Sequence, residues 1–142
     1  MAENAKNEIF SIAGVVVHGD KRGREIGFPT ANIPVDEAVL NEAVILRDGV
    51  YTSWLERADG TRLAATTSVG HRPTFYGKDA VRLVEVYVLD FCGDLYGEAV
   101  TVRFVERLRP QRAFDSVETL VAQLEADVAH TRQWAEQAER AA

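Results

Sequence analysis

Apolar and polar side chains alternate over much of the first 105 residues, which predicts strands rather than helices. The apolar run Phe10–Val17 is typical of a buried strand. Runs rich in β-branched and aromatic residues follow at Gly49–Arg57 and Arg62–Val69, and the turn Asp59–Gly60 between them is a strong hairpin signal. The pattern therefore predicts an antiparallel hairpin near the middle of the chain.

Two more alternating runs extend this β pattern. Val81–Phe91 is the longest of them, and Glu98–Val105 alternates again after a turn at Gly93–Asp94. We expect Gly70–Pro73 to end the strand that precedes them, because glycine and proline interrupt regular structure. Short links between successive strands favour antiparallel pairing.

After residue 114 the spacing of apolar residues changes to three and four, which indicates an amphipathic helix. Asp115 is a suitable N-cap, and Glu118 three residues later resembles a capping box. We expect this helix to run to about Gln137. Its apolar face consists of Val117, Leu120, Val121, Leu124 and Val128.

These elements predict a mainly β fold of five or six antiparallel strands followed by one helix. Closing such a sheet into a full or partial barrel removes its exposed edges. A chain of 142 residues fits a single domain. We expect a flexible N-terminus over residues 1–9, the domain over residues 10–137 and a frayed end over residues 138–142.

Composition narrows the functional class. The net charge of −6 argues against general nucleic-acid binding, although basic residues cluster around residues 21–24 and 103–112. Local basic clusters in an acidic protein suit a small anionic ligand. The single cysteine, Cys92, indicates a reducing compartment, and no signal peptide or membrane-spanning run is visible. We therefore expect a cytoplasmic protein that contacts no membrane.

The segment Gly27–Asn32, which follows a glycine-rich basic loop, carries the first candidate chemistry. Pro29 fixes the backbone, and Thr30 and Asn32 project to the same side if the segment is extended. Two neutral oxygen ligands of this kind can share Mg²⁺ with substrate phosphates. The spacing alone favours the simpler alternative, a β-turn with an Asx cap.

Two further features suggest a binding site. Glu85 interrupts an apolar row within a predicted strand, so it is either a solvent-facing residue or a candidate general base. Arg109, Arg112 and Phe114 precede the helix and could hold a planar or anionic ligand, or could form a solvated basic linker. The three histidines lack metal-ligand spacing.

Taken in order, six segments of the chain resemble the riboflavin kinase family, which also occurs as the C-terminal domain of bifunctional bacterial FAD synthetases. The segments are residues 14–32, 49–51, 67–75, 84–91, 94–98 and 108–115. The resemblance implies a six-stranded antiparallel Greek-key barrel with a C-terminal α-helix. It also implies transfer of the γ-phosphate of ATP to the 5′-hydroxyl of riboflavin, giving FMN and ADP.

The resemblance further implies roles for single residues. Glu85 would be the catalytic base, and Thr30 and Asn32 would hold Mg²⁺ and the nucleotide phosphates. The remaining nucleotide-binding residues would be Gly19, Arg24, Val88, Asp90 and Tyr96. The residues that bind the flavin would be Arg109, Arg112 and Phe114.

The partners implied are small molecules, namely riboflavin, ATP, FMN and ADP, together with Mg²⁺. We expect a monomer that binds no nucleic acid. Because only about nine residues precede the first predicted strand, we expect FMN but not FAD as product. Two alternatives stay open at this point: a non-catalytic module that binds a flavin or nucleotide on the same barrel, and an unrelated β-barrel interaction domain.

Overall fold

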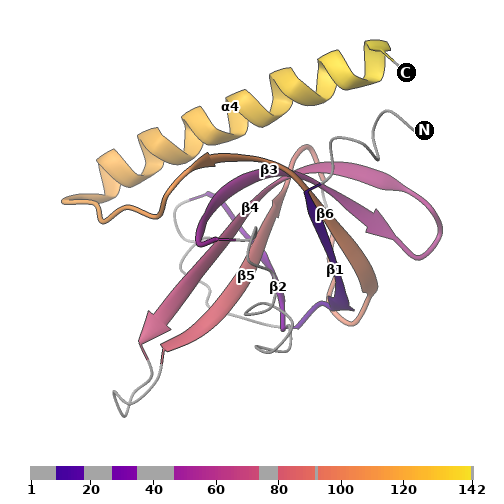
Figure 1. Ribbon diagram of the computed structural model, residues 1–142, viewed down its shortest axis with the longest axis horizontal. Coiled ribbons are helices and arrows are strands. Elements are labelled where there is room, and N and C mark those ends of the chain that lie inside the picture. The colour runs from indigo at the N-terminus through magenta and orange to yellow at the C-terminus, as the bar shows by residue number, and fades with distance from the viewer. Residues whose placement is uncertain (1–8, 18–26, 35–46, 74–79, 92, 142) are drawn as a thin grey trace.

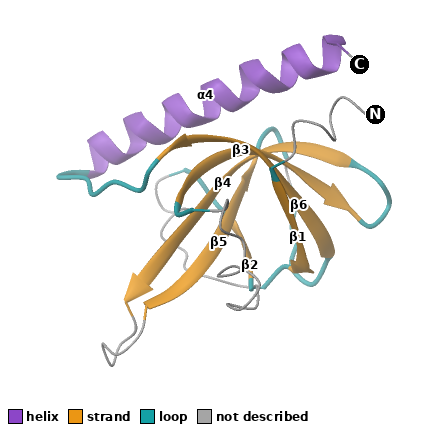
Figure 2. Ribbon diagram, viewed as in Figure 1, coloured by secondary structure: helices purple, strands orange, loops and turns teal. Residues whose placement is uncertain are grey.

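The computed structural model describes residues 9–17, 27–34, 47–73, 80–91 and 93–141. Within these residues the chain forms six strands and one long helix, which lies along one side of the curled sheet (Figures 1 and 2). The elements are β1 (Phe10–Val15), β2 (Ala31–Ile33), β3 (Gly49–Arg57), β4 (Arg62–Pro73), β5 (Ala80–Val88), β6 (Ala99–Arg109) and α4 (Val117–Ala141).

The strands form one antiparallel sheet in the order β1-β6-β3-β4-β5-β2. This is a Greek-key arrangement, since β3, β4 and β5 follow one another and β2 lies beside β5. The sheet curls until its two edges meet at a bridge between Val17 and Asn32. The predicted mainly β barrel with a C-terminal helix is therefore confirmed, in a partly closed form.

Alternation along the strands sends one set of side chains into the curled sheet. Tyr51 and Leu55 of β3, Val84 and Val86 of β5, and Phe104 of β6 are all buried there. The rings of Tyr51 and Phe104 meet edge to face, with centroids 5.2 Å apart. Burying each such side chain contributes about 1.5–3 kcal/mol. The core therefore fills the inside of the sheet and leaves its outer face available.

Helix α4 packs against that outer face, over β3 and β4 (Figure 1). Trp134 stacks at a tilt on Trp54, with ring centroids 5.2 Å apart. The buried hydroxyl of Thr131 lies 3.1 Å from that of Thr52 and accepts a hydrogen bond from Thr66 at 2.9 Å. These contacts fix the second half of the helix on the sheet. No helix among the described residues is long and apolar enough to cross a membrane.

The helix ends differ from the prediction. Ser116, not Asp115, is the N-cap: its Oγ accepts from the Thr119 N–H at 3.2 Å, and Thr119 Oγ1 accepts from the Ser116 N–H at 3.3 Å. Serine caps helices as well as aspartate does, so the sequence alone could not separate the two. The helix also continues past Gln137 to Ala141, through residue types with high helix propensity.

Strand boundaries differ as well. β4 continues through the expected break to Pro73, since Gly70 pairs with Leu83 and Pro73 with Ala80. Pro73 is the last residue of the strand, where a missing N–H costs little. The Gln111 side chain occupies the space beside Gly70, where an added Cβ would lie 3.0 Å from its amide nitrogen. At the other end of the hairpin, β5 stops at Val88, before the predicted Phe91.

Candidate active site

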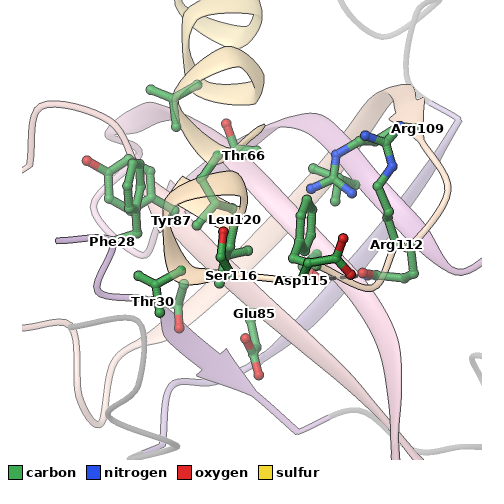
Figure 3. A pocket seen from close by; sticks show the side chains of 17 residues that line it. Phe28, Thr30, Thr66, Glu85, Tyr87, Arg109, Arg112, Asp115, Ser116 and Leu120 are labelled. Atoms are coloured by element: carbon green, nitrogen blue, oxygen red, sulfur yellow. Dashed lines mark hydrogen bonds between the residues drawn. The ribbon is translucent and has the colours of Figure 1, made fainter. Parts of the chain in front are cut away.

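A cavity of about 630 Å³ opens between the outer face of the sheet, the loop at residues 110–116 and the first half of α4 (Figure 3). This volume is typical of pockets for small ligands and cofactors. Most of its aliphatic side chains come from α4. The lining residues are Phe28, Thr30, Val50, Thr66, Ser68, Glu85, Tyr87, Arg109, Gln111, Arg112, Phe114, Asp115, Ser116, Val117, Leu120, Leu124 and Val128.

One cross-strand row forms the floor of this cavity. Asn32 pairs with Glu85, Glu85 with Ser68, Ser68 with Val50, and Val50 with Arg109. Residues directly opposite one another in antiparallel strands project from the same face of a sheet. Four of the five line the cavity, and Asn32 extends the row beyond it. The fold thus places the predicted metal-side and flavin-side residues at opposite ends of one row.

Glu85 lies near the middle of the floor. It is half-buried, and its neighbours Val84 and Val86 point the other way into the core. Thr30 lines the same side of the cavity as Glu85 (Figure 3). Beside them the rings of Phe28 and Tyr87 pack at a tilt, with centroids 5.4 Å apart. A carboxylate, a hydroxyl and an aromatic pair therefore occupy this end.

The opposite end is held by a buried ion pair. Nε of Arg109 lies 3.1 Å from both carboxylate oxygens of Asp127, and Nη2 donates to Oδ2 at 2.8 Å. The two side chains are only 9% and 4% exposed. The guanidinium also lies 5.8 Å from the centre of the Phe114 ring. Gln123 donates to Asp127 at 2.9 Å and accepts from Arg112 at 3.0 Å.

A second contact ties the loop to the sheet. The side-chain amide of Gln111 donates to Ser68 Oγ at 2.8 Å and to the Val69 carbonyl at 2.9 Å. The loop is therefore fixed on two sides, to the sheet by Gln111 and to the helix by Arg112, which donates to Gln123. It covers the floor close to Glu85, because Ser68 is the cross-strand partner of that residue.

Some predicted site residues lie elsewhere. Val88, Asp90 and Tyr96 do not line the cavity. Asp90 forms an ion pair with Arg132 of α4, which raises the pKa of that arginine, and Tyr96 is 54% exposed on a turn. Their nucleotide-binding roles stay predictions. So do those of Gly19 and Arg24, which lie outside the described residues.

The sequence interpretation missed Asp127 and Gln111. The signal for Asp127 was present, since this carboxylate interrupts the apolar face formed by Leu124, Val128 and their neighbours, as Glu85 interrupts its strand. No comparable signal marks Gln111, an exposed residue in a loop.

Comparison with known proteins identifies the family. Residues 6–135 match the model of the riboflavin kinase (flavokinase) family. This chain belongs to that family. The predicted family membership is therefore confirmed over nearly the whole chain.

Individual related proteins support this family assignment. The bifunctional riboflavin kinase/FMN adenylyltransferase of Listeria monocytogenes is 43% identical over 123 residues, which is 87% of this chain and 37% of that protein. The crystal structure of riboflavin kinase from Trypanosoma brucei matches with a TM-score of 0.67 and 27% identity, over 89% of this chain and 76% of that one.

A Streptococcus pneumoniae structure described as a macrolide-efflux protein matches with a TM-score of 0.71 and 40% identity, over 87% of this chain and 38% of that one. The chain spans roughly two fifths of the length of the curated relatives that it matches.

The family implies a divalent cation bound with ATP, and the chemistry of the cavity floor fits one. Mg²⁺ prefers oxygen ligands and takes few of them from the protein. Thr30, Asn32 and Glu85 all bear side-chain oxygens on this part of the sheet. Among the described residues, no group of three or more His, Cys, Asp and Glu side chains could hold a metal ion by itself.

Proposed function

We propose that this chain transfers the γ-phosphate of ATP to the 5′-hydroxyl of riboflavin, giving FMN and ADP. The observation that supports this most directly is the position of Glu85 in the cavity floor. It pairs across strands with Asn32 of β2 and shares the cavity with the apolar side chains of α4. Riboflavin likewise has a polar part and an apolar part. Its polar ribityl chain carries the reacting hydroxyl, and this chain is attached to a flat ring system. The cavity matches both parts in one continuous space.

In this mechanism Glu85 is the general base. Its carboxylate accepts the proton of the ribityl 5′-hydroxyl while that oxygen attacks the γ-phosphorus. A new P–O bond forms, and the bond to the β-phosphate oxygen breaks with its electron pair remaining on ADP. A positioned general base contributes about 10²- to 10⁴-fold to the rate. Because phosphoryl transfer needs little covalent help, positioning supplies much of the remainder.

Thr30 and Asn32 would hold Mg²⁺ together with the phosphates. When bound, the cation neutralises charge on the transferring phosphoryl group. We assign Gly19 and Arg24 to the phosphate side, and Val88, Asp90 and Tyr96 to the nucleotide side, from the family resemblance. Thr30 is half-buried in the cavity wall, so its hydroxyl can act on a ligand there.

The flavin ring would lie against the apolar side of α4. Leu120, Leu124 and Val128 provide a flat aliphatic wall, and Phe114 closes the loop side. Arg109 and Arg112 line the same part of the cavity. This arrangement excludes water from the flavin while the ribityl chain reaches Glu85.

The test is direct. Purified protein is incubated with riboflavin and ATP in the presence of Mg²⁺, and FMN is separated by chromatography. FMN formation that requires both ATP and the cation is expected. Riboflavin binding without FMN, under every divalent cation tried, would instead identify a non-catalytic flavin-binding module.

We also propose that the protein acts as a cytoplasmic monomer on small molecules and binds no nucleic acid. The net charge of −6 supports the last point. Size-exclusion chromatography with light scattering measures the oligomeric state, and a dimer mass would contradict this proposal.

A further inference from the structure

Three of the five N–H groups of Arg109 already donate hydrogen bonds within the protein. Nε and Nη2 donate to Asp127, and Nη1 donates to the Pro110 carbonyl at 3.2 Å. All three nitrogens therefore have partners within the protein, and one flat face of the guanidinium lies near Phe114. Arg109 is consequently suited to hold neighbouring groups in place rather than to grip a ligand.

Asp127 joins α4 directly to Arg109 of β6 and, through Gln123, to Arg112 of the loop. Its carboxylate accepts from Arg109 and from Gln123, which lies one helical turn earlier. The oxygen of the Gln123 amide accepts from Arg112. One end of this amide suits a carboxylate and the other suits a guanidinium, so the four side chains form a continuous matched network.

The fold has no evident need for a charge at this position. Asp127 lies within the apolar face of the helix, and α4 is already anchored further along by Thr131 and Trp134. Replacing a buried ion pair by apolar side chains is often neutral or stabilising, so such a pair is weak evidence for a role in stability. The fixed position of this ion pair beside the cavity is therefore better evidence for a role in the site.

We propose that Asp127, assisted by Gln123, is a positioning residue for flavin binding. It holds Arg109, and through it Phe114, against the helix, so that the flavin side of the cavity is formed before the ligand arrives. Arg112 is exposed and joined to the network by one hydrogen bond, so it supplies donors to carbonyl or phosphate oxygens of the ligand. Preorganised sites bind more tightly because the protein loses less conformational entropy on binding. This inference rests on the proposed function.

The test compares Asp127→Asn and Arg109→Lys with the wild type. Asparagine removes the charge at nearly constant size, and lysine cannot make the forked contact of arginine. We expect the riboflavin Kd, measured by quenching of flavin fluorescence, and the riboflavin KM to rise about 10- to 100-fold. The KM for ATP and kcat at saturating flavin should stay near their wild-type values. Gln123→Leu, which leaves the ion pair in place, should give a smaller rise.

Trp134→Leu is the matched control, because it loosens the same helix at its contact with Trp54, and neither of these residues lines the cavity. It should lower Tm and leave the riboflavin Kd unchanged. The proposal is overturned if Asp127→Asn and Arg109→Lys also lower only Tm, with a wild-type riboflavin Kd and KM.

Failure of the proposed function would look different. Wild-type protein that quenches flavin fluorescence but makes no FMN contradicts the kinase activity, and the Kd comparison then still decides the role of Asp127. Wild-type protein that neither binds flavin nor makes FMN overturns both.

Discussion

Replacing Glu85 by glutamine tests the chemical step with little disturbance of the fold. The amide has nearly the shape of the carboxylate, and its cross-strand neighbours Asn32 and Ser68 are uncharged. Val84 and Val86, which anchor this part of β5 in the core, point to the opposite face. The variant should therefore keep the fold of the wild type and lose the ability to accept a proton.

The expected loss of kcat is about 10²- to 10⁴-fold, the usual contribution of a general base. At about 1.4 kcal/mol for each factor of ten, this corresponds to roughly 3–5 kcal/mol of transition-state stabilisation. Because glutamine still fills the same place in the cavity floor, the riboflavin Kd should hardly change. The effect should therefore appear in kcat rather than in binding.

The assay measures FMN formation by chromatography at saturating riboflavin and ATP, and riboflavin Kd by fluorescence quenching. Glu106→Gln is a suitable control, since that carboxylate is exposed on β6, contacts His130 and does not line the cavity. A kcat equal to that of the wild type in Glu85→Gln would remove this residue from the mechanism. A large rise in riboflavin Kd would show that it binds substrate rather than accepting a proton.

Three further predictions concern the metal, the core and pH. Thr30→Ala should raise the Mg²⁺ concentration needed for half-maximal FMN formation, and an unaltered Mg²⁺ titration would contradict its assigned role. Phe104→Ala, at a fully buried position, should lower the free energy of unfolding by about 3–5 kcal/mol in urea titrations, and a loss below about 1 kcal/mol would refute this description of the core. The hydrogen bond from Arg103 at 2.8 Å holds the pKa of Glu56 below its usual 4.5. That pair should therefore stabilise the protein above pH 4.5 and lose its effect as the pH falls through the lowered pKa. The difference in unfolding free energy between wild type and Glu56→Gln should accordingly shrink in acid. A difference that does not change with pH would show that the pair is inert.

Strands with one buried face were predictable from the sequence, because burial of alternate residues leaves a period of two. That is why β5 and β6 were found, whereas β3 is buried on both faces and was recognised by its β-branched and aromatic residues. β2 has three residues, too few for a period to show, and it exists because β5 offers it a pairing edge. The extension of β4 to Pro73 was missed for a related reason: pairing with β5 overrides a local signal that usually ends a strand.

Site residues were predictable where a charged side chain interrupts the apolar pattern of its own strand or helix. Glu85 does so in a strand, and Asp127 does so in a helix, although only the first was recognised. Pairing across the fold was not predictable. Arg109 and Asp127 are 18 residues apart, and Gln111 and Ser68 are 43 apart, so each contact depends on how the loop at residues 110–116 lies against sheet and helix.

The location of the cavity on the outer face has a consequence for protein engineering. Along β5, Glu85 and Tyr87 face the cavity, whereas Val84 and Val86 face the core. Substrate selectivity and thermal robustness can therefore be altered separately within one strand. A mutant library confined to cavity-facing positions of β4 and β5 other than Glu85 can explore new flavin analogues without disturbing the core, and core-facing positions can be optimised in parallel.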